Sequence, residues 1–197
     1  MNSIFLGRVP SSWADLAYPS LRPLATWSSN LIARLTQIES WVENPGDIPK
    51  VLNLAYFFNP QSFLTAIMQV TAQRNNSELD KLTIQTAPTR KTVEQTDSAA
   101  RFGGAYVYGL YLEGARWNWN AMIMEESLPR EMFFQMPVIS CHAVPVDRME
   151  KNGVYSCPVF KTLSRGPTFV FFATLRSKLP TAKWVLGGVV MVLETDE

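Results

Sequence analysis

The side chains in this sequence that are of catalytic types are few and scattered. Glu113 and the adjacent residues Glu125 and Glu126 are the carboxylates from which an acid–base pair could be built. Adjacent glutamates are typical of a solvated turn, and no histidine lies near them in the sequence to complete a catalytic set. We therefore expect no catalytic residue in this chain.

Two cysteines and one histidine are the remaining candidates for redox or metal chemistry. Cys141 and Cys157 are far apart in the sequence, and neither belongs to a CxxC motif. The single histidine, His142, follows Cys141, and adjacent residues on a strand point to opposite faces. We expect two ordinary buried thiols, no metal site and no cofactor-binding residue.

Motifs for nucleotide binding and nucleophilic catalysis are absent from the sequence. It contains no GxxxxGK[ST], no GxGxxG and no GxSxG. The formal net charge is +1 over 197 residues, whereas a nucleic-acid-binding protein normally has a strong basic excess. The first ten residues do not resemble a signal peptide, and the apolar run at 184–193 is about half a membrane span. We expect a soluble intracellular protein with neither a nucleic-acid nor a membrane partner.

The elements that would position these residues begin with helices. Ser12-x-x-Asp15 resembles a capping box for a short helix that ends at Pro19. Ser20 is the expected cap of a second helix, which ends at Asn44-Pro45-Gly46. Apolar residues of this helix recur at steps of three and four and form one stripe: Leu24, Trp27, Leu31, Leu35, Ile38 and Val42.

A third helix is predicted from Asn59-Pro60 to about Arg74, because asparagine caps helices and proline favours the first helical position. Large apolar residues surround its start: Phe57, Phe58, Phe63 and Leu64. Such a group is too large for a solvated surface. We hypothesise that this helix joins the helical and β parts of the protein.

After Asn76 the apolar period changes from helical to alternating. Strands are predicted over residues 79–87, 105–113, 137–144, 154–163, 168–175 and 184–193, with a polar loop at 88–101. Gly109, within one of these strands, indicates a bulge or a close backbone approach. The order predicts an α+β fold, with N-terminal helices (1–76) packed on a C-terminal antiparallel β-barrel-like subdomain (77–197).

Glu113 and Arg116 flank Gly114-Ala115 near the end of a predicted strand. An arginine there can bind a carboxylate or a backbone carbonyl through a charge-assisted hydrogen bond. We therefore expect structural rather than catalytic roles for both residues.

Several segments, in order along nearly the whole sequence, resemble the C-terminal domain of dynein heavy chains. They are VPSSW (9–13), AYPSL (17–21), FFNPQSFLTA (57–66), LYLEGARW (110–117), MPVI (136–139), YSCPVFKT (155–162) and WVLGGV (184–189). The segments NPQSFLTAIMQ, RGPT and PVDRME are most similar to axonemal outer-arm heavy chains. Three local departures are the lack of a tryptophan at 50–55, Ala72-Gln73-Arg74 in place of the family's AR[KQ], and the acidic tail at 194–197.

The resemblance implies a non-catalytic domain that lies across one face of a ring of AAA+ modules. ATP and Mg²⁺ would bind only to that ring, and microtubules to a stalk, both outside this chain. The implied partners are the ring of the same heavy chain and other dynein subunits, with no direct microtubule contact. The implied location is the axoneme of a cilium or flagellum, with the cytoplasm as the alternative. The residues leave one other function open, a free-standing ligand-binding or hydrolase β-barrel that uses Glu113 or Glu125.

Overall fold

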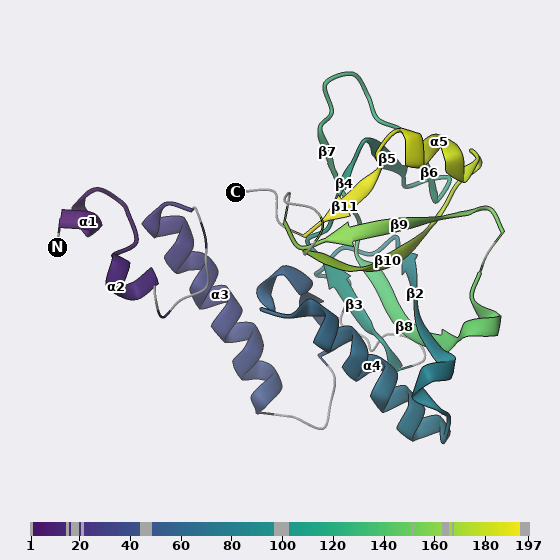
Figure 1. Ribbon diagram of the computed structural model, residues 1–197, viewed down its shortest axis with the longest axis horizontal. Coiled ribbons are helices and arrows are strands. Elements are labelled where there is room, and N and C mark those ends of the chain that lie inside the picture. The colour runs from purple at the N-terminus through teal and green to yellow at the C-terminus, as the bar shows by residue number, and fades with distance from the viewer. Residues whose placement is uncertain are drawn as a thin grey trace.

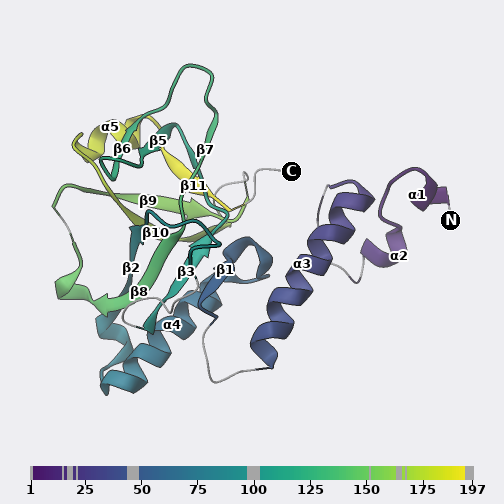
Figure 2. The same cartoon turned by 180° about the vertical axis from the view of Figure 1, so that it is seen from behind.

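The computed structural model describes residues 2–14, 16, 20, 22–43, 49–96, 103–150, 152–162, 166 and 168–193. Three helices stand to one side of a β-rich body: α1 (Asn2–Phe5), α2 (Ser11–Ala14) and α3 (Leu24–Val42). The separation is visible in Figure 1, and Figure 2 shows it from behind. None of the helices in these ranges has the length and apolar character needed to span a membrane.

The N-terminal helices begin at different residues from those expected. α2 starts at Ser11, so Ser12 lies inside the helix and is not its cap. α3 starts after Pro23, and Ser20 instead accepts a hydrogen bond from the Arg22 backbone N–H at 3.2 Å. The cause is Pro23, because the residue before a proline is disfavoured in helical conformation. Asp15, Pro19 and the stop at 44–46 lie outside the described residues.

The third predicted helix is confirmed as α4 (Pro60–Asn75). The Asn59 side chain accepts a hydrogen bond from the Ser62 backbone N–H at 3.3 Å, and Pro60 is the first helical residue. Asn76 ends the helix in the left-handed conformation, with φ of 48°. Local sequence therefore fixes both ends of α4.

The strands form two larger sheets and a hairpin. A four-stranded sheet has the order β1 (Val51–Asn53), β3 (Ala105–Tyr108), β8 (Ile139–Pro145), β2 (Leu82–Pro88). A five-stranded sheet has the order β10 (Phe169–Arg176), β9 (Val154–Phe160), β11 (Val190–Val192), β4 (Tyr111–Glu113), β7 (Phe133–Gln135). The hairpin joins β5 (Ala115–Asn118) and β6 (Ile123–Glu126). Short 3₁₀ helices η1 (Leu54–Tyr56), η2 (Leu79–Lys81) and η4 (Val146–Arg148) connect these elements.

The predicted α+β class is confirmed, and the sheets are barrel-like without closing into a barrel. Most strand pairs are antiparallel, as predicted, but β1 pairs with β3 and β9 with β11 in parallel. β1 lies before the predicted boundary at residue 76 and yet pairs with a strand after it. The two-subdomain division remains a prediction.

The predicted strand over 105–113 is in fact two strands in different sheets. The backbone leaves β3 at Tyr108 and enters β4 at Tyr111, with Gly109 between them at φ of +78°. A Cβ at Gly109 would lie 2.7 Å from Nδ2 of Asn53, so the expected close approach is confirmed. The prediction of one continuous strand was wrong, because the left-handed turn redirects the backbone.

The predicted strand over 184–193 is also divided. Its first part belongs to helix α5 (Thr181–Leu186), and only β11 is extended. Gly188, with φ of +66°, follows the helix in a conformation typical of helix ends. Trp184 is buried and donates from its indole nitrogen to Oγ of Ser177 at 2.8 Å.

A side chain of α3 completes the open edge of the four-stranded sheet. Nε2 of Gln37 donates to the Asn53 carbonyl at 3.0 Å, and its Oε1 accepts from the Asn53 N–H at 2.8 Å. Asn53 is in β1, the edge strand, so this amide takes the place of a neighbouring strand. Sequence reasoning missed this contact because Gln37 lies in no motif.

We expect Gln37→Glu to lower the free energy of unfolding by about 1–3 kcal/mol. A carboxylate cannot donate to the Asn53 carbonyl, whereas Gln37→Asn retains the amide on a shorter side chain. Urea denaturation of both variants and of the wild-type protein measures the differences in the free energy of unfolding. Equal stability of Gln37→Glu and the wild-type protein would contradict an edge-completing role.

Candidate interaction surfaces

The three candidate carboxylates are engaged in separate interactions. Glu125 accepts from Nδ2 of Asn118 at 2.7 Å across the β5–β6 hairpin. Glu126, the next residue of β6, forms an ion pair with Lys183 of α5. Glu113 lies in β4, between Phe133 of β7 and Val190 of β11. Because adjacent strand residues point to opposite faces, Glu125 and Glu126 are not brought together as an acid–base pair.

Both thiols are buried, as expected from the sequence. Cys141 and Cys157 are free cysteines, and burial raises the pKa of Cys141 to about 12 and also raises that of Cys157. Burial lowers the pKa of His142. In the part of the protein that the structure describes, no group of three or more His, Cys, Asp or Glu residues is arranged to hold a metal ion.

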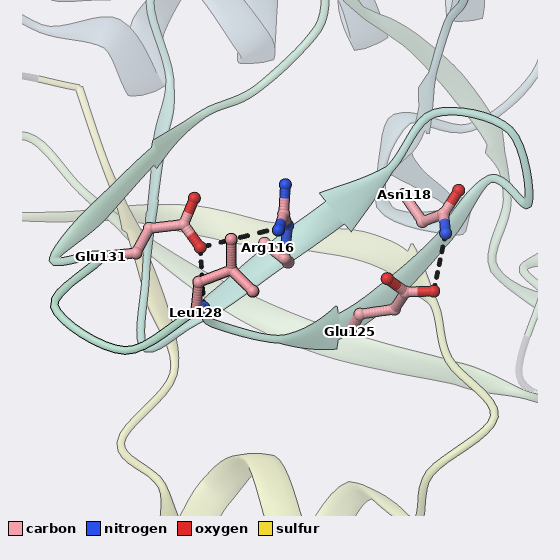
Figure 3. A network of polar contacts seen from close by, with 5 residues as sticks. All are labelled: Arg116, Asn118, Glu125, Leu128 and Glu131. Atoms are coloured by element: carbon pink, nitrogen blue, oxygen red, sulfur yellow. Dashed lines mark hydrogen bonds and ion pairs between the residues drawn. The ribbon is translucent and has the colours of Figure 1, made fainter.

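Arg116 is part of a polar network that braces the loop between β6 and β7 (Figure 3). Its Nε lies 4.0 Å from Oε2 of Glu131, and the same oxygen accepts from the Leu128 backbone N–H at 2.9 Å. The guanidinium also lies over the Phe134 ring, 5.5 Å from its centroid. The contact with Glu131 therefore involves one guanidinium nitrogen rather than a two-pronged pair.

We expect Arg116→Ala to lower the free energy of unfolding by about 1 kcal/mol, since a long ion pair and a cation–π contact each contribute little at a partly exposed site. Arg116→Lys keeps the charge but loses the planar contact with Phe134, so its effect should be smaller. Thermal unfolding of the two variants measures this. An unchanged melting temperature for Arg116→Ala would rule out the structural role.

The group around the start of α4 divides into buried and exposed members. Phe57 and Phe63 are buried and stack at 5.1 Å between ring centroids, with Trp41 of α3 edge-on to both. Leu64 is buried in the same cluster, but Phe58 is 61% exposed. The expectation that all four residues are covered was therefore wrong for Phe58, which sits where the backbone turns into the helix cap.

α4 contacts elements of both large sheets. It packs against β2, β8 and β10 (Figure 1). Nε2 of Gln61 donates to the carbonyls of Phe169 and Val170, each at 3.1 Å, and Nζ of Lys161 donates to the Phe58 carbonyl at 3.1 Å. The helix thus touches α3 through aromatic rings and the five-stranded sheet through hydrogen bonds, which agrees with the hypothesis of a joining helix.

α3 has one covered face and a second apolar face that is open. Trp27, Leu31 and Ile38 of the predicted stripe lie on the covered face, together with Arg34 and Trp41. Leu35 and Val42, also from that stripe, are exposed instead. They share the open face with Ile32. The exposed fractions are 64% for Ile32, 48% for Leu35 and 70% for Val42. We call Ile32, Leu35 and Val42 the outer stripe.

The short N-terminal elements also expose apolar residues. Phe5 and Leu16 are 85% and 92% exposed, and Leu6 and Trp13 are exposed as well. Trp13 stacks on Trp27 of α3 at 6.5 Å between ring centroids, so α2 and α3 are in contact. The exposed apolar residues of α3 and of these short elements are therefore candidates for an interaction site.

Comparison with known proteins decides the family. The family model for the C-terminal domain of the dynein heavy chain matches residues 1–193. This protein belongs to that dynein family. The flagellar outer-arm dynein beta chain of Chlamydomonas reinhardtii is 48% identical over 94% of the 197 residues, and the ciliary dynein beta chain of Heliocidaris crassispina is 45% identical over 98%. Human dynein axonemal heavy chain 17 is 43% identical over 98%.

The 197 residues span about 4% of the length of each of these dynein heavy chains. The matching relatives therefore carry this dynein domain as a small part of a much longer polypeptide. The resemblance drawn from the sequence motifs is confirmed, including its similarity to the outer-arm type.

Proposed function

We propose that this protein is a non-catalytic domain that docks on the AAA+ ring of its own heavy chain and stabilises a microtubule-based motor of cilia or flagella. The main support for this proposal is the outer stripe of α3, an apolar face that is left exposed. The domain spans only about 4% of the length of its relatives. The free energy falls when a partner covers an exposed apolar face of this kind. The names of the relatives, ciliary and flagellar outer-arm chains, support an axonemal location.

Docking is tested in the intact heavy chain by charge substitution on the outer stripe. Ile32→Glu combined with Leu35→Glu places two charges where the proposal requires burial, which is costly without a partner charge. We expect limited proteolysis to release the domain from the ring at least about tenfold faster, since about 1.4 kcal/mol of lost docking is already tenfold.

Ser40→Glu is the matched control, because Ser40 is exposed on α3 but lies about 80° around the helix axis from Ile32 and about 140° from Leu35. It should leave the release rate unchanged. Release of the double variant at the wild-type rate would show that the outer stripe is not the docking face.

We further expect the 197-residue protein neither to bind nor to hydrolyse ATP. It lacks a phosphate-binding loop, and its carboxylates Glu125 and Glu126 are held in separate contacts. Isothermal titration calorimetry with ATP and Mg²⁺ measures this. Stoichiometric binding would contradict the non-catalytic role.

A further inference from the structure

A groove lies between the two large sheets, at a place remote in sequence from the outer stripe. Its walls are residues 82–84 of β2 and 170–172 of β10, and Leu64, Thr65 and Met68 of α4 contribute to the lining. Its volume is about 780 Å³, within the range of ligand-binding sites. The lining residues that the structure describes are all uncharged. We call it the α4 groove.

Both walls of the groove are edge strands. β2 is the last strand of the four-stranded sheet, and β10 is the last strand of the five-stranded sheet. The two edges meet at Thr86 and Thr174, where Oγ1 of Thr86 accepts from the Thr174 N–H at 2.6 Å and donates to its carbonyl at 3.3 Å. Before these residues the edges line opposite sides of the groove.

The side to which the backbone N–H and C=O of Phe172 point follows from the residue opposite it in β9. Phe172 is opposite Pro158, which has no N–H, so the two residues cannot form a doubly hydrogen-bonded pair. The N–H and C=O of Phe172 must therefore point away from β9. The backbone N–H and C=O of Thr174, two residues further along β10, point to the same side as those of Phe172. Both groups of Thr174 form hydrogen bonds with the Thr86 side chain.

Side chains already occupy the outward positions on either side of Phe172. Gln61 donates to the carbonyls of Phe169 and Val170, and Thr86 bonds to Thr174. Within the ranges that the structure describes, no hydrogen bond to the outward N–H or C=O of Phe172 is present, and its ring is 53% exposed. An unpaired position on a strand edge beside an apolar groove is suited to an extended peptide.

We propose that the α4 groove binds a short, extended, uncharged segment of the same heavy chain, from outside these 197 residues. The segment pairs with the backbone of Phe172 and places an apolar side chain against Leu64 and Met68. The heavy chain is the occupant because relatives extend far beyond this domain, which spans about 4% of their length. A tethered segment has a high effective concentration, so a short contact suffices. The described lining residues carry no charge that could pair with a charged side chain, so they favour an uncharged segment.

The test uses the intact heavy chain with the photo-crosslinking residue p-benzoylphenylalanine in place of Met149. Met149 lines the groove but lies outside α4 and the strands, so the replacement leaves both walls intact. We expect one dominant crosslink, within the same polypeptide and outside residues 1–197. A dominant crosslink to another polypeptide, to a second copy or to this domain itself would overturn the proposal, as would the absence of a dominant crosslink.

Two pairs of variants make the test specific. Thr65→Lys introduces a charge into the groove, whereas Gln69→Lys introduces it about one turn further along α4 and outside the groove. Phe172→Pro removes the N–H that the segment needs, whereas Phe172→Leu keeps it, and an edge strand tolerates proline at an outward N–H. Thr65→Lys and Phe172→Pro should each reduce the crosslink at least tenfold, and the controls less than threefold. A crosslink that all four variants leave unchanged would overturn the proposal.

The outer stripe is a separate surface, so the two proposals can fail independently. The charge variants Ile32→Glu and Leu35→Glu should leave the crosslink from Met149 at the same position if the groove is filled by its own segment. Loss of the crosslink in those variants would instead show that it only reports ring docking, and would overturn the groove proposal.

Discussion

Phe63→Ala is expected to lower the free energy of unfolding by about 3–5 kcal/mol, the usual loss for a fully buried phenylalanine. Phe63 is 2% exposed and packs against Phe57 and Trp41. Because its helix also contacts β2, β8 and β10, we expect the helical and β parts to loosen together. Hydrogen exchange should therefore show faster exchange in α3 and also in amides of residues 106–112.

Phe58→Ala is the control for this prediction, since Phe58 precedes the same helix but is exposed. It should change the free energy of unfolding by less than about 1 kcal/mol. If Phe63→Ala increased exchange only in the helices while residues 106–112 kept their protection, α4 would not be the joining element.

Gly104→Ala should also destabilise the fold, by about 3 kcal/mol, through a clash with the backbone. A Cβ at this position would lie 2.0 Å from the carbonyl oxygen of Cys141 and 2.8 Å from Cβ of His142. Gly104 immediately precedes β3, and Ala105 pairs with Cys141 in the middle of the four-stranded sheet. The obstructing atoms are a backbone oxygen and a Cβ attached directly to the backbone, so they cannot rotate away. Relief of the clash therefore requires β3 and β8 to separate. Urea denaturation measures the loss.

Gly187→Ala is the matched control. Gly187 has φ of −74°, and the nearest atom to an added Cβ is 3.3 Å away. Its substitution should cost less than about 1 kcal/mol. Similar stabilities for the two variants would mean that β3 and β8 do not approach as closely as described.

The features that the sequence determined are those encoded by neighbouring residues. Asn59 and Pro60 specify the start of α4, and Asn76 its end, because cap side chains and proline act within one turn. The alternation in residues 79–87 placed Ile84 and Thr86 on the covered face of β2. The ordered motifs identified the family, since several long matches in sequence are specific. The burial of Cys141 and Cys157 also followed from residue type.

Tertiary structure decided where strands divide and which sheet each part joins. Residues 105–113 have a continuous strand pattern, but the left-handed turn at Gly109 sends β3 and β4 into different sheets. Residues 184–193 are apolar throughout, and an apolar run alone does not distinguish a buried helix from a strand. The short strands β5, β6 and β7 were missed because they are only three or four residues long.

Tertiary structure also decided which apolar residues are covered and which strand edges are closed. The periodicity of α3 cannot distinguish Leu31, which is partly covered, from Leu35, which is open, because both lie on one broad apolar side. Gln37 and Gln61 complete strand edges far from them in the sequence, through contacts that no local pattern encodes. The open position at Phe172 depends on its pairing with Pro158. Strand register brings those residues together, and register is a property of the folded sheet rather than of either segment alone.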